Sequence, residues 1–468
     1  MPSVRTLVVL VLAVRSLASC AIGAPGGGEA GRPPNIIVFF ADDMGMGDVG
    51  AYGSEDIPTP NIDSIAANGV RFTNGYVSCP QCAPSRAALM TGRYQNRFGF
   101  EYNYNNAIEE DQADAGLPLT EATIASRLKS VGYTTGVIGK WHLGWDASEK
   151  FHPLNRGYDY FFGMLEGSGG YMPREGMALS RSKIFRNHDR VKTEAYLTDV
   201  FGDEVVSFIE RHKADPFFLY VPFNAPHTPL EATEEYLERA GEHESEKRKI
   251  YSAMVISMDD AIGAALEKLR AEGLSDNTMV FFLTDNGGQE RQGGDNGIYR
   301  AGKGSMYEGG IRVPFVVQWP AVYPAGVSYD AAVTSRDILP TAIGAAGVES
   351  KADLRLDGTD ITPFLLDAGR DGPHASEPLC WRLAVRPRGP DDIPWAVRLD
   401  NWKLVGVKSS QRGGANKSGV ELYDLSKDPR EEHNVATDHP DVVERLRAAY
   451  AAWESEMADP AWELKPAG

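Results

Sequence analysis

Cysteine and basic residues are scarce in this sequence. It contains only 4 cysteines in 468 residues, and Cys79, Cys82 and Cys380 are those beyond residue 20. If Cys79 and Cys82 bound zinc, a structural site would need two more soft ligands, and Cys380 could supply only one. This argues against zinc. Lysine and arginine total 47 against 65 aspartate and glutamate residues, for a formal net charge of -18. Nucleic acids and acidic membrane faces bind basic surfaces, so both are excluded as main partners.

Internal repeats are also absent, which excludes a solenoid or a propeller. With 42% apolar residues, the chain is long enough for one large domain and a smaller one. We predict a catalytic domain over residues 35–370 and a C-terminal subdomain over residues 371–468. The change is indicated by Pro and Gly rich segments followed by the short alternating strands WAVRLDNWKLVGV and GVELYDL, which predict an antiparallel sheet. A helix is expected near Asp441 to Met457.

The first residues have the arrangement of an export signal. A basic residue, Arg5, precedes an apolar run over residues 7–14 that is too short to span a bilayer stably. We therefore predict a signal peptide over residues 1–20 and a Gly and Pro rich linker over residues 21–34. The end of the signal resembles a bacterial lipobox, in which Cys20 carries a lipid anchor. This predicts a periplasmic protein or an outer-membrane lipoprotein, with secretion as the alternative.

Four apolar segments end abruptly in polar residues. They are NIIVFFADDMG from Asn35, YTTGVIGKWHLG from Tyr133, PFFLYVPFNAPHTP from Pro216 and TMVFFLTDNGG from Thr278. Apolar runs of this length are typical of strands buried on both faces. Helical patterns lie between them, for example over residues 59–69, 120–132 and 258–269. The alternation predicts an α/β fold with a mostly parallel sheet, whose ligands bind at the carboxyl ends of the strands.

Two of these strand ends carry oxygen donors. Asp42 and Asp43 follow the first strand, and Asp285 and Asn286 follow the last. A single Asp-Asp pair is more often a turn or a helix cap. Two such pairs at equivalent strand ends indicate instead a site for a hard cation, calcium or magnesium.

The other two strand ends carry cationic or proton-transferring side chains. Lys140 and His142 follow one strand, His227 lies between prolines after the other, and Lys303 lies in the glycine-rich segment RAGKGSMYEGG. A lone histidine is usually structural, but these lie where pockets form. A metal surrounded by carboxylates, lysines and histidines suits a tetrahedral oxyanion such as phosphate or sulfate.

The segment CPQCAPSRAALMTGRY, from Cys79, adds a helix to this group. Pro84 suits the first position of a helix and Gly92 its end, which places Cys82 at the N-terminus. Free amides and the helix dipole favour an anion there, and Arg86 can hold it with two donors. The two cysteines also fit a thiol oxidoreductase pair. Such a protein needs no aspartate pairs, so we expect Cys82 to carry the chemistry and Cys79 to pack beside the helix.

At this point the residues resemble the sulfatase family. Its signature is Cys, a small residue, Pro, Ser and Arg, then an apolar residue and Thr-Gly, which matches Cys82 to Arg86 with Leu89, Thr91 and Gly92. The likeness continues in order through ADDMG, GKWHLG, APHTP, TDNGG, KGSMYEGGIRVP and ELYDLSKDP, over about residues 34–435. It is similar to the type I, formylglycine-dependent branch, near the arylsulfatases.

The resemblance implies a fold and a cofactor. The fold would be the alkaline-phosphatase-like α/β sandwich, with helices on both faces of the large sheet. A separate formylglycine-generating enzyme would oxidise Cys82 to formylglycine. The modified residue would bind Ca²⁺ together with Asp42, Asp43, Asp285 and Asn286.

The resemblance also implies a reaction. The sulfate pocket would be lined by Arg86, Lys140, His142, His227 and Lys303. His227, with Lys303, would protonate the leaving group, and His142, near Lys140, would accept a proton in the second step. We expect hydrolysis of sulfate esters, on a sulfated carbohydrate, with release of inorganic sulfate. The alternative is a phosphonate monoester hydrolase or phosphodiesterase, which can share the Cys-x-Pro-Ser-Arg signature. GSGGYMPREGM, after Glu166, is among the segments expected to set the choice of sugar.

Overall fold

The computed structural model describes residues 32–103, 115–144, 148–174, 176–348, 355–367, 369–383, 393–407 and 419–461. The predicted signal peptide, Cys20 and all but the end of the predicted linker lie outside these residues. Within them, no helix combines the length and apolar character needed to cross a membrane.

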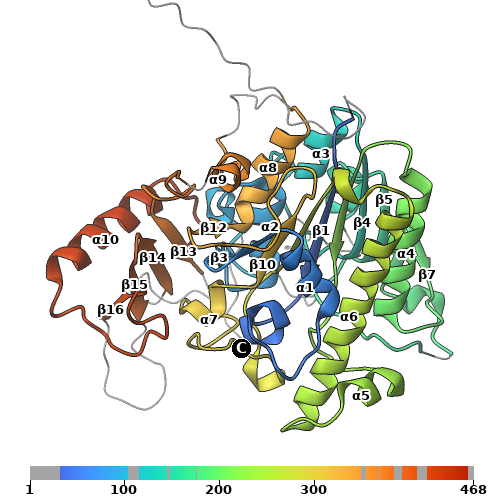
Figure 1. Cartoon of the computed structure of the whole chain (residues 1–468), viewed down its shortest axis with the longest axis horizontal. Helices are drawn as coiled ribbons and strands as arrows, with labels where there is room; N and C mark the ends of the chain where they lie inside the picture. Colours follow the sequence, from blue (N-terminus) through green and yellow to red (C-terminus); the bar gives the residue numbers. More distant parts are fainter. Residues whose placement is uncertain are drawn as a thin grey trace, which may run out of the picture.

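One large sheet forms the centre of the described structure (Figure 1). Its strands are β1 (Asn35–Ala41), β2 (Val70–Phe72), β4 (Thr134–Lys140), β5 (Tyr160–Met164), β6 (Ile184–Arg186), β7 (Asp189–Val191), β8 (Phe217–Pro222), β9 (Thr278–Thr284), β10 (Phe315–Gln318) and β11 (Val327–Tyr329). Within the described residues these ten strands have the order β11-β2-β10-β9-β1-β8-β4-β5-β6-β7. The central strands β9, β1, β8, β4 and β5 run parallel. The predicted α/β class with a mostly parallel sheet is confirmed.

The central strand β1 shows why its sequence is continuously apolar. Every second residue from Ile36 packs into the core on one face of the sheet, and every second residue from Ile37 into the core on the other. Because successive side chains of a strand point to opposite faces, a strand covered on both sides must be apolar at every position. In β1 all seven residues are buried.

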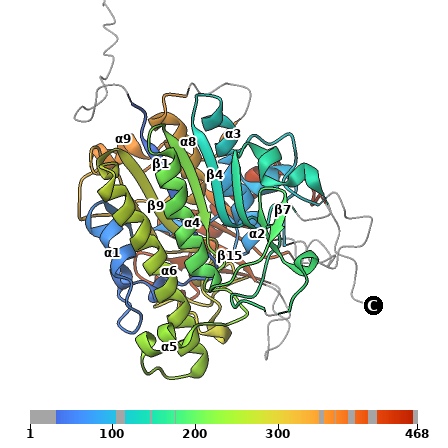
Figure 2. The same cartoon turned by 90° about the vertical axis from the view of Figure 1, so that its right-hand side faces the viewer.

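Helices cover both faces of the sheet. The helices of the described residues are α1 (Pro60–Ala67), α2 (Cys82–Thr91), α3 (Ile124–Lys129), α4 (Leu197–His212), α5 (Glu234–Ala240), α6 (Glu246–Ala271), α7 (Glu308–Ile311), α8 (Ile338–Ala345), α9 (Thr362–Leu366) and α10 (Pro440–Glu454), of which α10 packs on a second sheet. Helices α4 and α6 lie side by side over one face (Figure 2), and α2, α3 and α8 pack on the other. The sheet therefore lies between two helical layers and presents its strand ends at the edges.

A second sheet near the C-terminus is antiparallel, as predicted. It consists of β13 (Leu379–Arg382), β14 (Trp395–Leu399), β15 (Trp402–Val407) and β16 (Gly419–Asp424). One face packs on α10, and the other packs on a cluster that includes Cys79. Just before that cysteine, β3 (Gly75–Tyr76) pairs with β12 (Val333–Thr334). The boundary near residue 370 stays a prediction.

A buried ion cluster joins the second sheet to α7. The ammonium group of Lys403, on β15, lies 2.8 Å from a carboxylate oxygen of Glu308, in α7, and 2.8 Å from one of Glu431. All three side chains are fully buried. Burial raises the pKa of Glu308, but Lys403 and Arg312 outweigh it and hold that pKa at about 2. Glu431 shares the same lysine, and burial raises its pKa to about 7.

Removing the lysine should destabilise the fold, because it would leave Glu431 buried without its cation and Glu308 with Arg312 as its ion-pair partner. We expect Lys403→Met to lower the free energy of unfolding by about 3 to 5 kcal/mol, measured by urea unfolding. The matched control is Lys427→Met, since Lys427 pairs with Asp424 but is 82% exposed. That change should cost less than about 1 kcal/mol. Equal losses in the two variants would contradict a structural role for the buried cluster.

Candidate active site

The sequence-predicted polar residues meet at one edge of the large sheet. Lys140 is the last residue of β4, and Asp42 and Asp285 directly follow β1 and β9. His227 lies five residues beyond the end of β8, at Pro222. Because β1, β4, β8 and β9 are parallel neighbours, their carboxyl ends lie at the same edge.

Each lysine is bound to one of the two adjacent aspartates. Lys140 Nζ donates to Asp42 Oδ2, and both side chains are fully buried. Lys303 Nζ lies 2.7 Å from Asp43, and Asn286 Nδ2 donates to Asp43 Oδ1 at 2.8 Å. His227 Nε2 lies 3.6 Å from Asp43 Oδ2. The structure thus brings the predicted oxygen donors and the predicted cations into one cluster.

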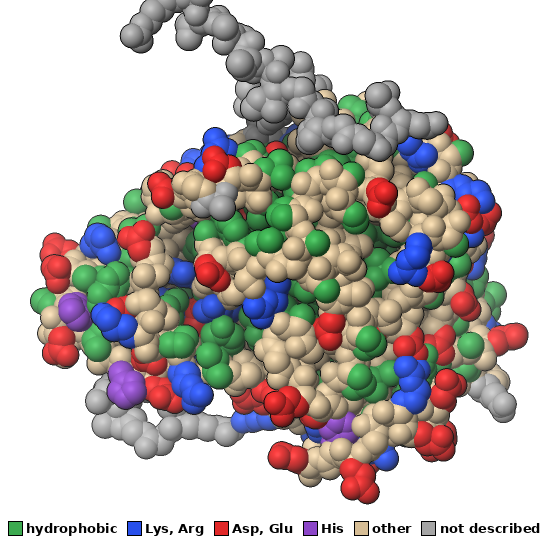
Figure 3. Space-filling model, viewed as in Figure 1, with side chains coloured by type: hydrophobic (Ala, Val, Ile, Leu, Met, Phe, Trp, Pro, Cys, Tyr) green, Lys and Arg blue, Asp and Glu red, His purple; other side chains and the backbone are tan. Residues whose placement is uncertain are grey.

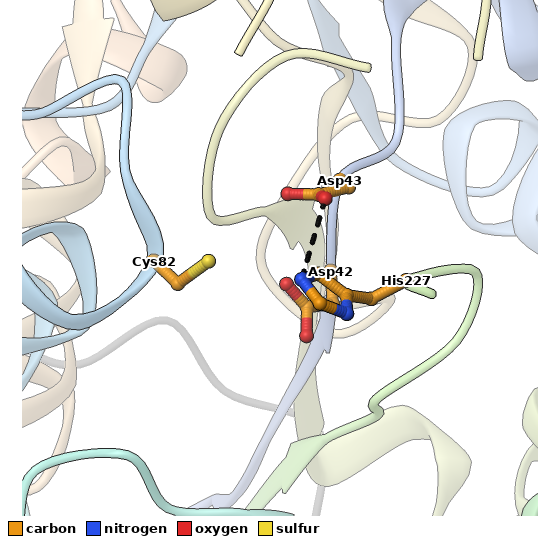
Figure 4. A group of neighbouring side chains, drawn as sticks. All are labelled: Asp42, Asp43, Cys82 and His227. Atoms are coloured by element: carbon orange, nitrogen blue, oxygen red, sulfur yellow. Dashed lines mark ion pairs between the residues drawn. The ribbon is translucent and has the colours of Figure 1, made fainter. Parts of the chain in front are cut away.

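Helix α2 brings Cys82 to this cluster. The helix begins at Cys82, so the prediction that Pro84 takes its first position is wrong by two residues. Proline is tolerated there because the first amides of a helix have no partner within it. The helix ends, as predicted, at Gly92, which has a φ of 65°. In Figure 4 the sulfur of Cys82 points from the helix towards Asp42, Asp43 and His227.

Arg86 joins α2 to three strand ends. Its Nη2 lies 2.7 Å from Asp285 Oδ2 and 3.7 Å from Asp42 Oδ2, and its Nη1 donates to the Lys140 carbonyl oxygen at 3.1 Å. The side chain is fully buried. Burial lowers the pKa of Arg86, but the negative charge of Asp285 and its neighbours more than reverses this, so the guanidinium stays charged.

The donors fit a hard cation. Ligand atoms of Asp42, Asp43, Cys82 and His227 lie within 4.8 Å of one another. Asp42 Oδ1 and Asn286 Oδ1 are buried and accept no hydrogen bond from any described residue. A buried oxygen without a partner is costly, and calcium prefers carboxylate and amide oxygens. The residues present therefore fit a calcium ion.

The carboxyl groups of the cluster differ in charge state. Burial raises the pKa of Asp43, but Lys303 and His227 have the larger, opposite effect, so that the pKa is about 2. Burial and the neighbouring Asp42 raise the pKa of Asp285 to about 6, although Arg86 opposes the rise. Near neutral pH Asp43 and Asp285 are therefore ionised, and a bound cation would relieve the repulsion between neighbouring carboxylates.

The thiol and the histidines of the cluster are neutral near pH 7. Burial raises the pKa of the Cys82 thiol to about 12, against the attraction of Lys140 and Lys303. Burial, followed by the charge of Lys140, lowers the pKa of His142 well below its usual range. Burial lowers that of His227 to about 4, although Asp43 acts in the opposite direction. A thiol held in its protonated form is a poor nucleophile, and this also argues against a redox pair with Cys79.

Several residues that support the site were not predicted from the sequence. Tyr171 donates from its hydroxyl to the carbonyl oxygens of Asn224 and His227. Tyr251 donates to the carbonyl oxygen of Asp43 at 3.0 Å. Only Tyr171 had a sequence signal, because it lies in the segment GSGGYMPREGM. The tyrosines hold the backbone that carries the site and leave the side chains of Asp43 and His227 available.

Two family models match this chain. The model described as Sulfatase matches residues 34–348, and the model described as N-sulphoglucosamine sulphohydrolase, C-terminal, matches residues 294–453. The first of these covers more than half of the chain and includes every residue of the cluster.

Proteins with curated names and proteins of solved structure are similar to this chain, and they too are sulfatases by name or share its fold. The chain is 36% identical to N-acetylgalactosamine-6-sulfatase of Sus scrofa over 75% of this chain and 69% of the relative. It is 33% identical to arylsulfatase A of Homo sapiens over 89% of this chain and 87% of the relative. The crystal structure of Ps i-CgsB in complex with k-i-k-neocarrahexaose superposes with a TM-score of 0.85 at 33% identity, over 93% of this chain and 95% of that one.

The buried thiol predicts slow alkylation. In protein that carries Cys82 as a thiol, we expect iodoacetamide at pH 7.5 to label it at least about 100-fold more slowly than an exposed cysteine, because its pKa near 12 leaves little thiolate. Lys427→Cys supplies the exposed control, and peptide masses measure both rates. Comparable rates would show that the thiol is accessible and ionised.

Proposed function

Because this chain belongs to the sulfatase family of the alkaline-phosphatase superfamily and is a sulfuric ester hydrolase, we propose that it removes sulfate from carbohydrates with a formylglycine at position 82 and a calcium ion. The observation that carries the proposal is the position of Cys82, at the start of α2 and beside Asp42, Asp43 and His227. The relatives named for sulfated sugars support the choice of a carbohydrate.

Calcium would be held by Asp42, Asp43, Asp285 and Asn286, together with an oxygen of the modified residue. When bound, it would neutralise the carboxylates and polarise an oxygen of the sulfate group. Lys140 and Lys303, which contact Asp42 and Asp43 in this structure, would then be available to the peripheral oxygens of the sulfate. Arg86 would hold the start of α2 against the strand ends.

Formylglycine would supply a carbon that carries two hydroxyl groups when hydrated, one to attack sulfur and one to expel the sulfate. Cys82 as a thiol or a serine lacks the second group. A separate formylglycine-generating enzyme would be needed for maturation. The free backbone amides at the start of α2 would stabilise the negative charge that develops at position 82.

The histidines would move the protons. His142, neutral and beside Lys140, suits a base that accepts a proton in the step that releases sulfate. His227 would protonate the leaving oxygen with Lys303. Its pKa near 4 in the free site is low for an acid, but the negative charge of a bound sulfate ester would raise it. Substrate binding would therefore prepare His227 for its role.

We also propose that the protein is exported, either to the periplasm or to the outer membrane through a lipid at Cys20. Secretion is the alternative. The support is the basic and apolar pattern of residues 1–20.

Formylglycine would be detected in the mass of the tryptic peptide that spans Cys82, whose aldehyde form is lighter than its thiol form.

Replacing the nucleophile should separate binding from turnover. We expect Cys82→Ser to bind a sulfated sugar with affinity near that of the parent, but to lower steady-state kcat at least about 100-fold, since a serine ester has no second hydroxyl to release sulfate. Released sulfate measures turnover. Cys79→Ser is the matched control and should keep kcat within about threefold, because Cys79 only packs against the C-terminal sheet.

The same assay distinguishes the alternative function. An aryl sulfate and an aryl phosphonate monoester would be compared on the same preparation. Faster turnover of the phosphonate would contradict the proposal, as would undiminished turnover by Cys82→Ser.

Calcium binding can be tested without activity. We expect Asp42→Asn to weaken Ca²⁺ binding at least about tenfold in calorimetry on chelator-treated protein, because Asp42 supplies a buried oxygen without another partner. Asp428→Asn, at a partly exposed acid near Glu432 and His433, is the control. Equal Ca²⁺ affinity in the parent and in Asp42→Asn would contradict this metal site.

A further inference from the structure

A cleft beside the active site has the chemistry of a second anion site. Its volume is about 590 Å³, and its lining includes Ser168, Arg174, Arg181, Lys192 and Pro229. The volume lies within the usual range for pockets that bind small molecules. It is formed by the segment after β5, the start of β6 and the residues before α4.

The cleft reaches the two histidines of the active site from both sides. A Cβ atom at Gly167, one residue before the lining, would lie 2.4 Å from His142 Nε2. On the other side, Pro229 follows Thr228, whose carbonyl oxygen lies 2.6 Å from His227 Nδ1. Two segments that contact these histidines therefore continue into the lining of the cleft.

The charge of the cleft is opposite to that of the whole protein. Its lining has four cations, Arg174, Arg181, Lys183 and Lys192, and a single acid, Glu194. Lys183 is paired with Glu166. The other three cations are exposed and form no ion pair with any described residue. In a chain with a net charge of -18, these cations gather positive charge at one cleft and are available to an anion from solution.

A larger cleft elsewhere in the described residues is unsuited to such a ligand. It has a volume of about 890 Å³ and is lined by Arg71, Arg248 and five acids, Glu55, Asp56, Glu244, Glu290 and Asp295. Its Arg248 is already bound to Asp48 and Asp56. Acidic side chains also gather along the neighbouring edge over α5 (Figure 3). A polyanionic sugar would be repelled there.

We infer that the smaller cleft binds a second anionic group of the substrate, on the sugar next to the one that carries the scissile sulfate. The inference rests on the proposed function and makes the substrate an oligosaccharide with at least two anionic groups. Arg174 and Arg181 contact the second anion, which is a sulfate ester or a uronate carboxylate. Apolar side chains such as Met172 and Pro173 in the same lining suit the carbon face of a sugar ring.

The test compares two double variants that each remove two positive charges. Arg174→Ala/Arg181→Ala changes the cleft, and Arg445→Ala/Arg447→Ala changes exposed residues of α10, remote from it. Three disaccharides share one scissile sulfate and differ in the neighbouring sugar, which is neutral, sulfated or a uronate. An aryl monosulfate reports on the active site alone.

For the cleft variant we expect kcat/KM to fall about tenfold or more on a doubly anionic disaccharide, through KM, and less than about twofold on the neutral disaccharide and the aryl sulfate. A fall on the sulfated or the uronate substrate identifies which anion the cleft takes. The control variant should leave all four values within about twofold. Equal losses on all substrates, or equal losses in both variants, would overturn the inference.

Failure of the proposed function has a different signature. In that case the unaltered protein would release sulfate from none of the substrates. The cleft is then tested by calorimetry with the disulfated disaccharide: weaker binding by the cleft variant alone supports it, and unchanged binding overturns it.

Discussion

The buried guanidinium of Arg86 is the interaction on which the site depends. It extends from the second turn of α2 and contacts Asp42, Asp285 and the carbonyl oxygen of Lys140, which belong to the ends of three different strands. A guanidinium has enough donors in fixed directions to bind all three, which an ammonium group lacks. The position of Cys82 relative to the aspartates follows from this contact, because Cys82 and Arg86 lie one turn apart on the same helix.

The electrostatics of the site are local. The net charge of -18 would repel a sulfated sugar at long range, but the Debye length at physiological salt is only about 8 Å. At shorter range the proposed substrate would meet Arg86, Lys140 and Lys303, each of which lies beside a buried carboxylate. Overall acidity and an anionic substrate are therefore compatible, provided that the cations are concentrated where the substrate binds.

Much of this arrangement could be predicted from the sequence, because long buried strands have a strong signal. The parallel core and the meeting of Asp42, Lys140, His227 and Asp285 follow from apolar runs that end in polar residues. Strands β6 and β7 could not be predicted, since three residues are too few for a periodic pattern. The start of α2 was misplaced because proline is allowed at more than one position of the first turn. The packing of Cys79 against the second sheet depends on contacts between residues about 300 positions apart, such as the bond from Trp381 Nε1 to the Val77 carbonyl oxygen.

The backbone at two strand ends shows how adjacent side chains reach one site. In an extended strand successive side chains point to opposite faces, so Asp42 and Asp43 could not both face the same cluster. Asp43 has a φ of 65° and His142 a φ of 52°, in the left-handed region that residues other than glycine rarely adopt. Such conformations cost of order 1 to 3 kcal/mol each and persist only where surrounding contacts hold them. Here Tyr251 binds the carbonyl oxygen of Asp43 and the backbone amide of His142 donates to Leu165, so the packing around the sheet edge maintains the turn that aims both side chains.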